Sequence, residues 1–182
     1  MIVKAPRAGL MEQAMALTGG KGPAPVHLWN PDFCGDSEMR IARDGTWFHQ
    51  GTPIGRAPLV RLFSTILKRE GDAYFLVTPV EKLSIAVEDV PFVAVDLEQD
   101  DQGISFITGQ GDLARLGADH PLRLKWDTPY VMVRAGLEAR VDRKTFFRLV
   151  EMGKVERFEG EDWFGVRSDG VFFPLMRAKD MG

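Results

Sequence analysis

The sequence predicts an α+β protein made of two related units, each reading strand–turn–strand–helix–strand, with largely antiparallel sheet. Residues 70–77 (EGDAYFLV) align without a gap on residues 159–166 (EGEDWFGV). Upstream of each copy, residues 56–62 and 143–149 both read Arg, two variable, two apolar, Arg, Leu. A match of this length at two places indicates one supersecondary unit used twice, with a shared core or cleft.

The repeat suggests a division of the chain into four segments. Residues 1–28 hold an N-terminal helix and linker, and residues 29–95 form the first α+β unit. Residues 96–128 are a connecting region of strand and loop, and residues 129–182 form the second unit. At 182 residues the chain is long enough to bury a proper core.

Near the N-terminus, residues 9–17 predict a short helix, because Leu10, Ala14 and Leu17 fall on one face. Residues 18–25 are rich in Gly and Pro and read as a linker. The sequence leaves open whether this helix docks on the body or moves freely.

The first unit begins with a hairpin. Strands are expected on both sides of Asp44-Gly45, because glycine accepts the positive φ of a type I′ turn. Further strands are expected at residues 74–77, 83–87 and 92–95, and another over residues 103–108.

A helix is expected from about Arg56, with Pro58 in its first turn, where no backbone donor is needed. Its apolar stripe comprises Leu59, Leu62, Phe63, Ile66 and Leu67. Lys68 and Arg69 suit the negative end of the helix dipole, and Gly71 is placed to end the helix.

The second unit repeats this order. Strands are expected at residues 130–133 and 137–141, followed by a helix that Asp142 can cap and that ends near Gly153. Strands at residues 163–167 and 171–175 then flank a second Asp-Gly turn. The pattern argues against a doubly wound nucleotide fold.

Bulk composition limits the classes of function. The net charge of −3 argues against general binding to nucleic acid, which needs concentrated Lys and Arg. The single cysteine rules out an internal disulfide. No run of about 18 or more apolar residues is present, so no membrane span is expected, and the chain is expected in the cytoplasm.

Cys34-Gly35-Asp36 is the first candidate for chemistry. A cysteine nucleophile or a metal site is conceivable with His27, His49 or His120 as partner. The structural alternative is a turn, in which Asp36 accepts backbone hydrogen bonds and Cys34 is a small buried apolar group. The spacing matches no established zinc set, so the structural alternative is favoured.

Charged residues supply the second set of candidates. Glu81 and Lys82 follow a buried strand in the first unit and have no counterpart in the second. Arg56 begins the first helix, where the dipole disfavours a cation and a carboxylate partner is expected. An ordinary turn for Glu81 and Lys82, and internal ion pairs for the arginines, are the simpler explanations of these positions. The alternative is a polar ligand-binding cleft lined by Arg40, Arg56, Glu81, Lys82 and Arg140.

Several short motifs follow one another along the chain in a distinctive order. They are Trp29, Cys34-Gly35-Asp36, Arg40-Ile41, Asp44-Gly45-x-Trp47, Pro53-Ile54-x-Arg56, Leu62-Phe63, Leu76-Val77-Thr78-Pro79-x-Glu81-Lys82, Pro91-Phe92 and Ser168-Asp169-Gly170-x-x-Phe173. This series resembles the bacterial domain-of-unknown-function family 1285, over roughly residues 29–175. The resemblance implies a fold with repeated motifs and a suggested role in signal transduction. It implies no established catalytic residue.

The expected function is therefore that of a cytoplasmic, non-enzymatic protein that binds a small polar ligand or a protein partner and takes part in signalling. No cofactor is expected. One alternative is a hydrolase or transferase that uses Cys34 or an unrecognised metal site. Another is a structural interaction protein, whose N-terminal helix docks on a partner.

Overall fold

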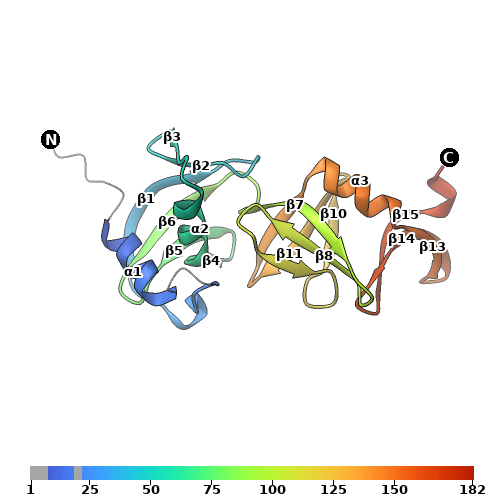
Figure 1. Ribbon diagram of the computed structural model, residues 1–182, viewed down its shortest axis with the longest axis horizontal. Coiled ribbons are helices and arrows are strands. Elements are labelled where there is room, and N and C mark those ends of the chain that lie inside the picture. Colours follow the sequence, from blue (N-terminus) through green and yellow to red (C-terminus); the bar gives the residue numbers. More distant parts are fainter. Residues whose placement is uncertain (1–7, 19–21) are drawn as a thin grey trace. The chain divides into compact units, whose positions relative to one another are not determined.

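The computed structural model describes residues 8–18 and 22–182 (Figure 1). Contacts divide the chain into two compact units, Met1–Pro91 and Phe92–Gly182. Both units mix helix with sheet, which confirms the predicted α+β class. Among the helices that the structure describes, none has the length and apolar character needed to cross a bilayer.

In its described residues the first unit holds two α-helices and one six-stranded sheet. Its elements are α1 (Ala8–Thr18), a 3₁₀ turn (Val26–Leu28), β1 (Phe33–Ile41), β2 (Trp47–His49), β3 (Thr52–Pro53), α2 (Ala57–Thr65), β4 (Leu67–Glu70), β5 (Ala73–Val77) and β6 (Lys82–Val87). The strand order is β3-β2-β1-β6-β5-β4. All neighbours are antiparallel except β1 and β6, which are parallel.

The core of this unit lies on one face of the sheet. Leu67, Leu76 and Leu83 are paired in register across β4, β5 and β6, and all three are buried. Leu62 and Phe63 of α2 are also buried. Burial of this apolar surface is the main stabilising contribution to the unit.

Helix α1 confirms the helix predicted at the N-terminus. Leu10 and Ala14 are buried, whereas Leu17 is 40% exposed. The helix lies against α2, so it is docked on the body (Figure 1). Part of the predicted linker, residues 19–21, lies outside the described residues.

The predicted first helix is too long. Helix α2 ends at Thr65, and the next residues form β4 instead of further helical turns. Leu67 leaves the helical stripe because it pairs with Leu76 in the buried leucine row. Gly71 has a φ of 60° in the turn between β4 and β5, so it shapes a hairpin and does not end the helix.

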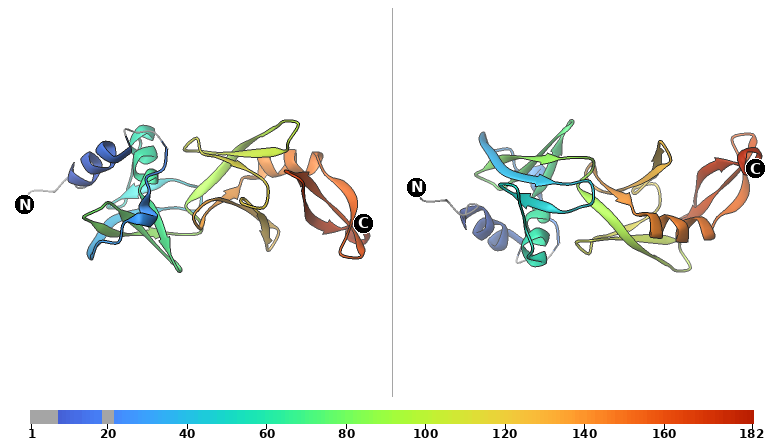
Figure 2. Two further views of the ribbon diagram at one scale, coloured as in Figure 1. Left: turned by 90° about the horizontal axis from the view of Figure 1, so that it is seen from below. Right: turned by 90° about the horizontal axis from the view of Figure 1, so that it is seen from above.

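The second unit holds one helix and two sheets. Its elements are β7 (Phe92–Gln99), β8 (Ile104–Thr108), β9 (Leu113–Arg115), β10 (Leu122–Lys125), β11 (Thr128–Arg134), β12 (Leu137–Val141), α3 (Arg143–Glu151), β13 (Lys154–Phe158), β14 (Glu161–Ser168), β15 (Val171–Arg177) and a 3₁₀ turn (Ala178–Asp180). One sheet has the order β10-β11-β12-β7-β8-β9, and the other is β13-β14-β15. Strands β7 and β12 are parallel. Figure 2 shows the elements in two further views.

The order of elements is consistent with the predicted repeat. Hairpin β1–β2, α2, hairpin β4–β5 and β6 are matched in order by β11–β12, α3, β13–β14 and β15. The pairing of the strands differs between the units. In the first unit β1 pairs with β6 and unites both hairpins in one sheet, whereas β13–β15 form a sheet of their own.

The cap predicted for the second helix is confirmed. Asp142 precedes α3, and its carboxylate accepts a hydrogen bond from the backbone N–H of Thr145 at 2.8 Å. Helix α3 ends at Glu151, two residues before Gly153.

Candidate functional site

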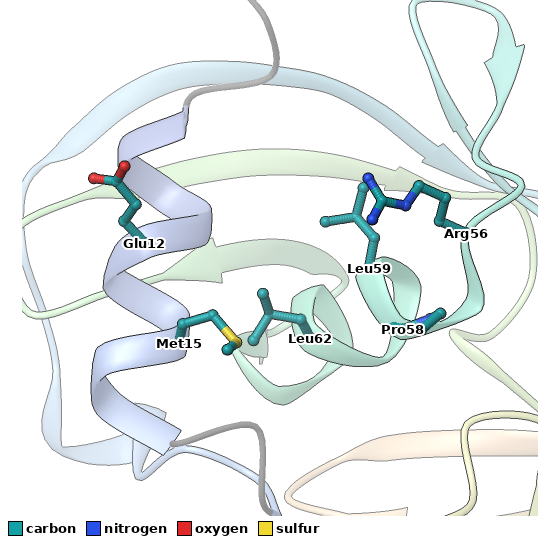
Figure 3. A pocket seen from close by; sticks show the side chains of 6 residues that line it. All are labelled: Glu12, Met15, Arg56, Pro58, Leu59 and Leu62. Carbon is teal, nitrogen blue, oxygen red and sulfur yellow. The ribbon is translucent and has the colours of Figure 1, made fainter.

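A groove of about 440 Å³ lies between α1 and α2 in the first unit (Figure 3). Its volume falls in the range of about 300–1,000 Å³ that is typical of small-molecule sites. Six of the described residues line it: Glu12, Met15, Arg56, Pro58, Leu59 and Leu62. The two helices thus supply an apolar surface with a charged residue from each.

Helix α1 contributes Glu12 and Met15, which lie about one turn apart and therefore on the same face. Leu10 and Ala14 on another face are buried, which fixes the helix to the body. Met15 is 51% exposed, so its thioether is available to a bound molecule. Methionine adapts readily to apolar groups of different shapes.

Helix α2 contributes Pro58, Leu59 and Leu62. Pro58 lies in the first turn, where the helix tolerates the missing N–H. Leu59 and Leu62 are one turn apart and form a continuous apolar ridge. Leu62 is buried, whereas Leu59 is half-buried. The ridge therefore belongs partly to the core and partly to the groove.

Two opposite charges border this apolar surface. Figure 3 shows Glu12 on α1 and Arg56 at the start of α2, with Met15, Leu59 and Leu62 between them. Both charged side chains are exposed. Within residues 8–18 and 22–182, neither Glu12 nor Arg56 forms an ion pair. The carboxylate partner expected for Arg56 is thus not found among the described residues.

Arg56 also lies at the positive end of a helix dipole. It is the N-cap of α2, with φ −93° and ψ 101°, and its side chain makes no capping hydrogen bond. The guanidinium and the helix N-terminus both favour an anion at this end of the groove. Glu12 favours a cation at the other end.

Of the five residues predicted to line a polar cleft, only Arg56 lines this groove. Arg40 forms an ion pair with Glu88, and its guanidinium carbon lies 4.2 Å from the centre of the Phe48 ring. This internal pair is the simpler explanation of Arg40 that the sequence allowed. Surface pairs of this kind contribute little stability.

Glu81 and Lys82 stand side by side at the start of β6. The backbone N–H of Glu81 donates to Thr78 Oγ1 at 3.1 Å, and Thr78 N–H donates to the Glu81 carbonyl at 2.8 Å. These bonds form the turn between β5 and β6. The turn predicted at this segment is therefore present.

Lys82 belongs to a small cluster on the outer face of the sheet. Its Nζ donates to Glu70 Oε2 at 2.6 Å and lies 4.4 Å from the centre of the Phe75 ring. Lys68 Nζ lies 3.4 Å from Glu70 Oε1 and donates to the Trp29 carbonyl at 2.9 Å. The hydrogen bond from Lys82, followed by that from Lys68, lowers the pKa of Glu70 against the opposing effect of desolvation.

Within the first unit, Arg40 and Lys82 do not come together. In the β1–β6 ladder Arg40 pairs with Ala86, whereas Lys82 pairs with Phe33. Positions 82 and 86 are about 13 Å apart at the usual rise of a strand. Arg140 belongs to the second unit, on β12. The predicted polar cleft across the repeat stays a prediction.

Cys34 is exposed on β1, so the prediction that it is buried is wrong. Its Sγ donates to the Asp32 carbonyl at 3.1 Å. Asp36 accepts a hydrogen bond from the Glu38 N–H at 2.8 Å, as predicted, but residues 34–36 lie within β1 and not in a turn. In the part of the chain that the structure describes, no three His, Cys, Asp or Glu side chains gather as metal ligands.

The sequence did not single out Glu12 and Met15 as site residues. Both lie on the predicted N-terminal helix, away from the face of Leu10 and Ala14. The available signal was an apolar Met15 off that face, beside a lone carboxylate. This signal indicates a groove only once α1 is known to lie on α2.

Comparison with known families covers both units. Residues 24–90 match the model of the N-terminal domain of DUF1285, described as a domain of unknown function. Residues 91–175 match the C-terminal domain of DUF1285, described as a protein of unknown function. The chain belongs to the DUF1285 family. The resemblance noted in the sequence is thus confirmed, and the two matches meet within one residue of the boundary between the two compact units.

Two crystal structures of DUF1285 family proteins resemble this chain. The protein from Silicibacter pomeroyi DSS-3 is 55% identical, with 95% of this chain and 97% of that chain covered and a TM-score of 0.84. The protein from Shewanella baltica OS155 is 30% identical, with 62% of this chain and 90% of that chain covered and a TM-score of 0.55. A comparison with curated proteins finds no match.

Proposed function

We propose that this DUF1285 protein is a binding protein, and that the groove between α1 and α2 receives the apolar part of its ligand or partner. The observation that carries the proposal is the lining. Met15, Leu59 and Leu62 present apolar surface between two charged groups that have no ion-pair partner among the described residues. An apolar surface with few well-placed polar groups is the usual character of a binding site.

The lining favours binding over catalysis. Among the described residues of the lining, only Glu12 and Arg56 are charged, and they lie apart, on opposite sides of the apolar side chains (Figure 3). General acid–base or nucleophilic catalysis needs reacting groups within hydrogen-bond reach of one another. The groove instead offers shape, apolar area and one charge at each end.

The position of α1 supports a signalling role. The groove has one wall on α1 and one on α2, so an occupant that contacts both walls stabilises the docked position of α1. A partner that recognises α1 only when it is docked would then respond to occupancy. The cytoplasm is our proposed location for this role.

The proposal is tested with an anilinonaphthalene sulfonate dye, whose aromatic rings suit the apolar lining and whose sulfonate suits Arg56. We expect saturable binding by the folded protein and about tenfold weaker binding to Met15→Glu, because the new carboxylate lies in the apolar lining. The matched control is Met176→Glu on β15, since Met176 is 46% exposed and does not line the groove. Equal dye affinity of the two folded variants would contradict the proposal.

A further inference from the structure

We infer that the occupant of the groove is an amphipathic helix of a partner protein, with a cationic side chain at the Glu12 end and an anionic side chain at the Arg56 end. This inference rests on the proposed binding function of the groove. It adds the chemical class of the occupant and the arrangement of its charges.

The charges on the groove are the first argument. Glu12 comes from α1 and Arg56 from the start of α2, with apolar side chains between them (Figure 3). Neither has an ion-pair partner within the described residues. A partner with one cation and one anion, separated by apolar surface, complements both ends at once.

A simple fatty carboxylate fits less well. Its head group would pair with Arg56, but its apolar chain would then extend toward Glu12. Contact between methylene groups and a carboxylate removes water from the charge without replacing its hydrogen bonds. Such a ligand would pair with Arg56 but would desolvate the Glu12 carboxylate without giving it a new hydrogen-bond donor.

The shape of the lining is the second argument. Leu59 and Leu62 form a ridge at helical spacing on one wall, and Met15 lies on the other wall. An amphipathic helix places its own apolar side chains at i, i+3 and i+4, a spacing that can interdigitate with such a ridge. Met15 adjusts to the side chain that it meets, as methionine does at surfaces that receive helices.

The inference is tested on the full chain with three synthetic amphipathic peptides of about 18 residues, long enough to form helix. All three carry the same leucine stripe at i, i+3, i+4 and i+7. One has Lys before the stripe and Glu after it, one has Lys at both ends, and one has Glu at both ends. The affinity of each peptide is measured by fluorescence anisotropy. Decanoate, the second probe, is tested separately for binding.

We expect the mixed-charge peptide to bind about two- to fivefold more tightly than either like-charged peptide, since exposed ion pairs are individually weak. Charge-reversing substitutions in the groove should change which peptide binds most tightly. Glu12→Lys should favour the peptide with two Glu ends, and Arg56→Glu should favour the peptide with two Lys ends. The matched control is Arg61→Glu, because Arg61 is exposed on the same helix but does not line the groove.

The outcomes separate this inference from the proposed function. Decanoate binding that Met15→Glu weakens, with no peptide binding, would overturn the helix and leave the groove as a ligand site. Peptide binding with no dependence on the end charges would overturn the charge arrangement. If the peptides, decanoate and the dye all fail to bind, the proposed function itself is wrong.

Discussion

Ser168 at the end of β14 is hydrogen-bonded to Ile104 at the start of β8, with 2.8 Å between the Ile104 backbone nitrogen and Ser168 Oγ. The Ser168 hydroxyl also donates to the Leu116 carbonyl at 2.6 Å. Both Ser168 and Ile104 are buried. One hydroxyl therefore joins the three-stranded sheet to the six-stranded sheet of the second unit, 64 residues away along the chain.

Ser168→Ala should destabilise the protein by about 1–3 kcal/mol, because it leaves a buried N–H and a buried carbonyl without this partner. Urea unfolding followed by circular dichroism measures the change. Ser105→Ala on β8 is the control, since Ser105 is half-buried and makes no side-chain hydrogen bond among the described residues. A loss no larger than that of the control would show that water replaces the hydroxyl.

Gly165→Ala should destabilise by about 2 kcal/mol or more. A Cβ at this position would lie 2.2 Å from the Phe173 carbonyl oxygen and 2.9 Å from the Pro174 Cα, and backbone atoms of a paired strand cannot easily move away. The control is Gly109→Ala, where nothing lies within 4 Å of the added carbon. The loss of stability in each variant is measured from its melting temperature. Equal melting temperatures of Gly165→Ala and Gly109→Ala would contradict the close approach of β14 and β15.

Local patterns predicted most of the elements but not how the strands pair. The Asp44-Gly45 hairpin, the helix after Asp142 and the N-terminal helix all depend on neighbouring residues, so the sequence contains them. The parallel pairing of β1 with β6 joins segments about 46 residues apart, and no local signal specifies it. The first helix is predicted too long for the same reason. Leu67 fits the helical apolar stripe in the sequence, and only its pairing with Leu76 shows that it belongs to a strand.

The candidate site could be predicted only in part. Arg56 stood out because a cation at a helix start needs an explanation, and it does line the groove. Glu12 and Met15 could not be chosen, because the sequence leaves open whether α1 docks at all. Their charge alone suggests Arg40 and Lys82 as site residues, yet both have carboxylate partners nearby, Glu88 and Glu70.

The helices α2 and α3 occupy matching places in the element order but begin differently. Asp142→Ala should destabilise by about 1 kcal/mol, because it removes the side-chain acceptor for the Thr145 N–H. Arg56→Ala should change stability by less than about 0.5 kcal/mol, since Arg56 makes no capping bond to α2. Chemical denaturation of both variants measures the contrast, and a large loss for Arg56→Ala would reveal a structural role that the groove proposal does not include.

Acid should remove the stability that the Lys68–Glu70–Lys82 cluster contributes. The pKa of Glu70 is lowered from 4.5 in the folded protein, chiefly by the hydrogen bond from Lys82, so folding favours the ionised carboxylate. Its contribution is complete above pH 4.5 and is lost as the pH falls from there through the lowered folded-state value. Glu70→Gln should therefore be less stable than the natural protein at pH 7, and the difference should shrink below pH 4.5.

Urea unfolding at pH 7, 5, 4 and 3 tests this dependence, because each midpoint reports the stability at that pH. Glu98→Gln is the control, since Glu98 is exposed on β7 and forms no ion pair among the described residues. Its difference from the natural protein should stay small at every pH. A gap between Glu70→Gln and the natural protein that stays constant from pH 7 to 3 would mean that the glutamine acts through packing, because only loss of the ionised carboxylate makes the gap depend on pH.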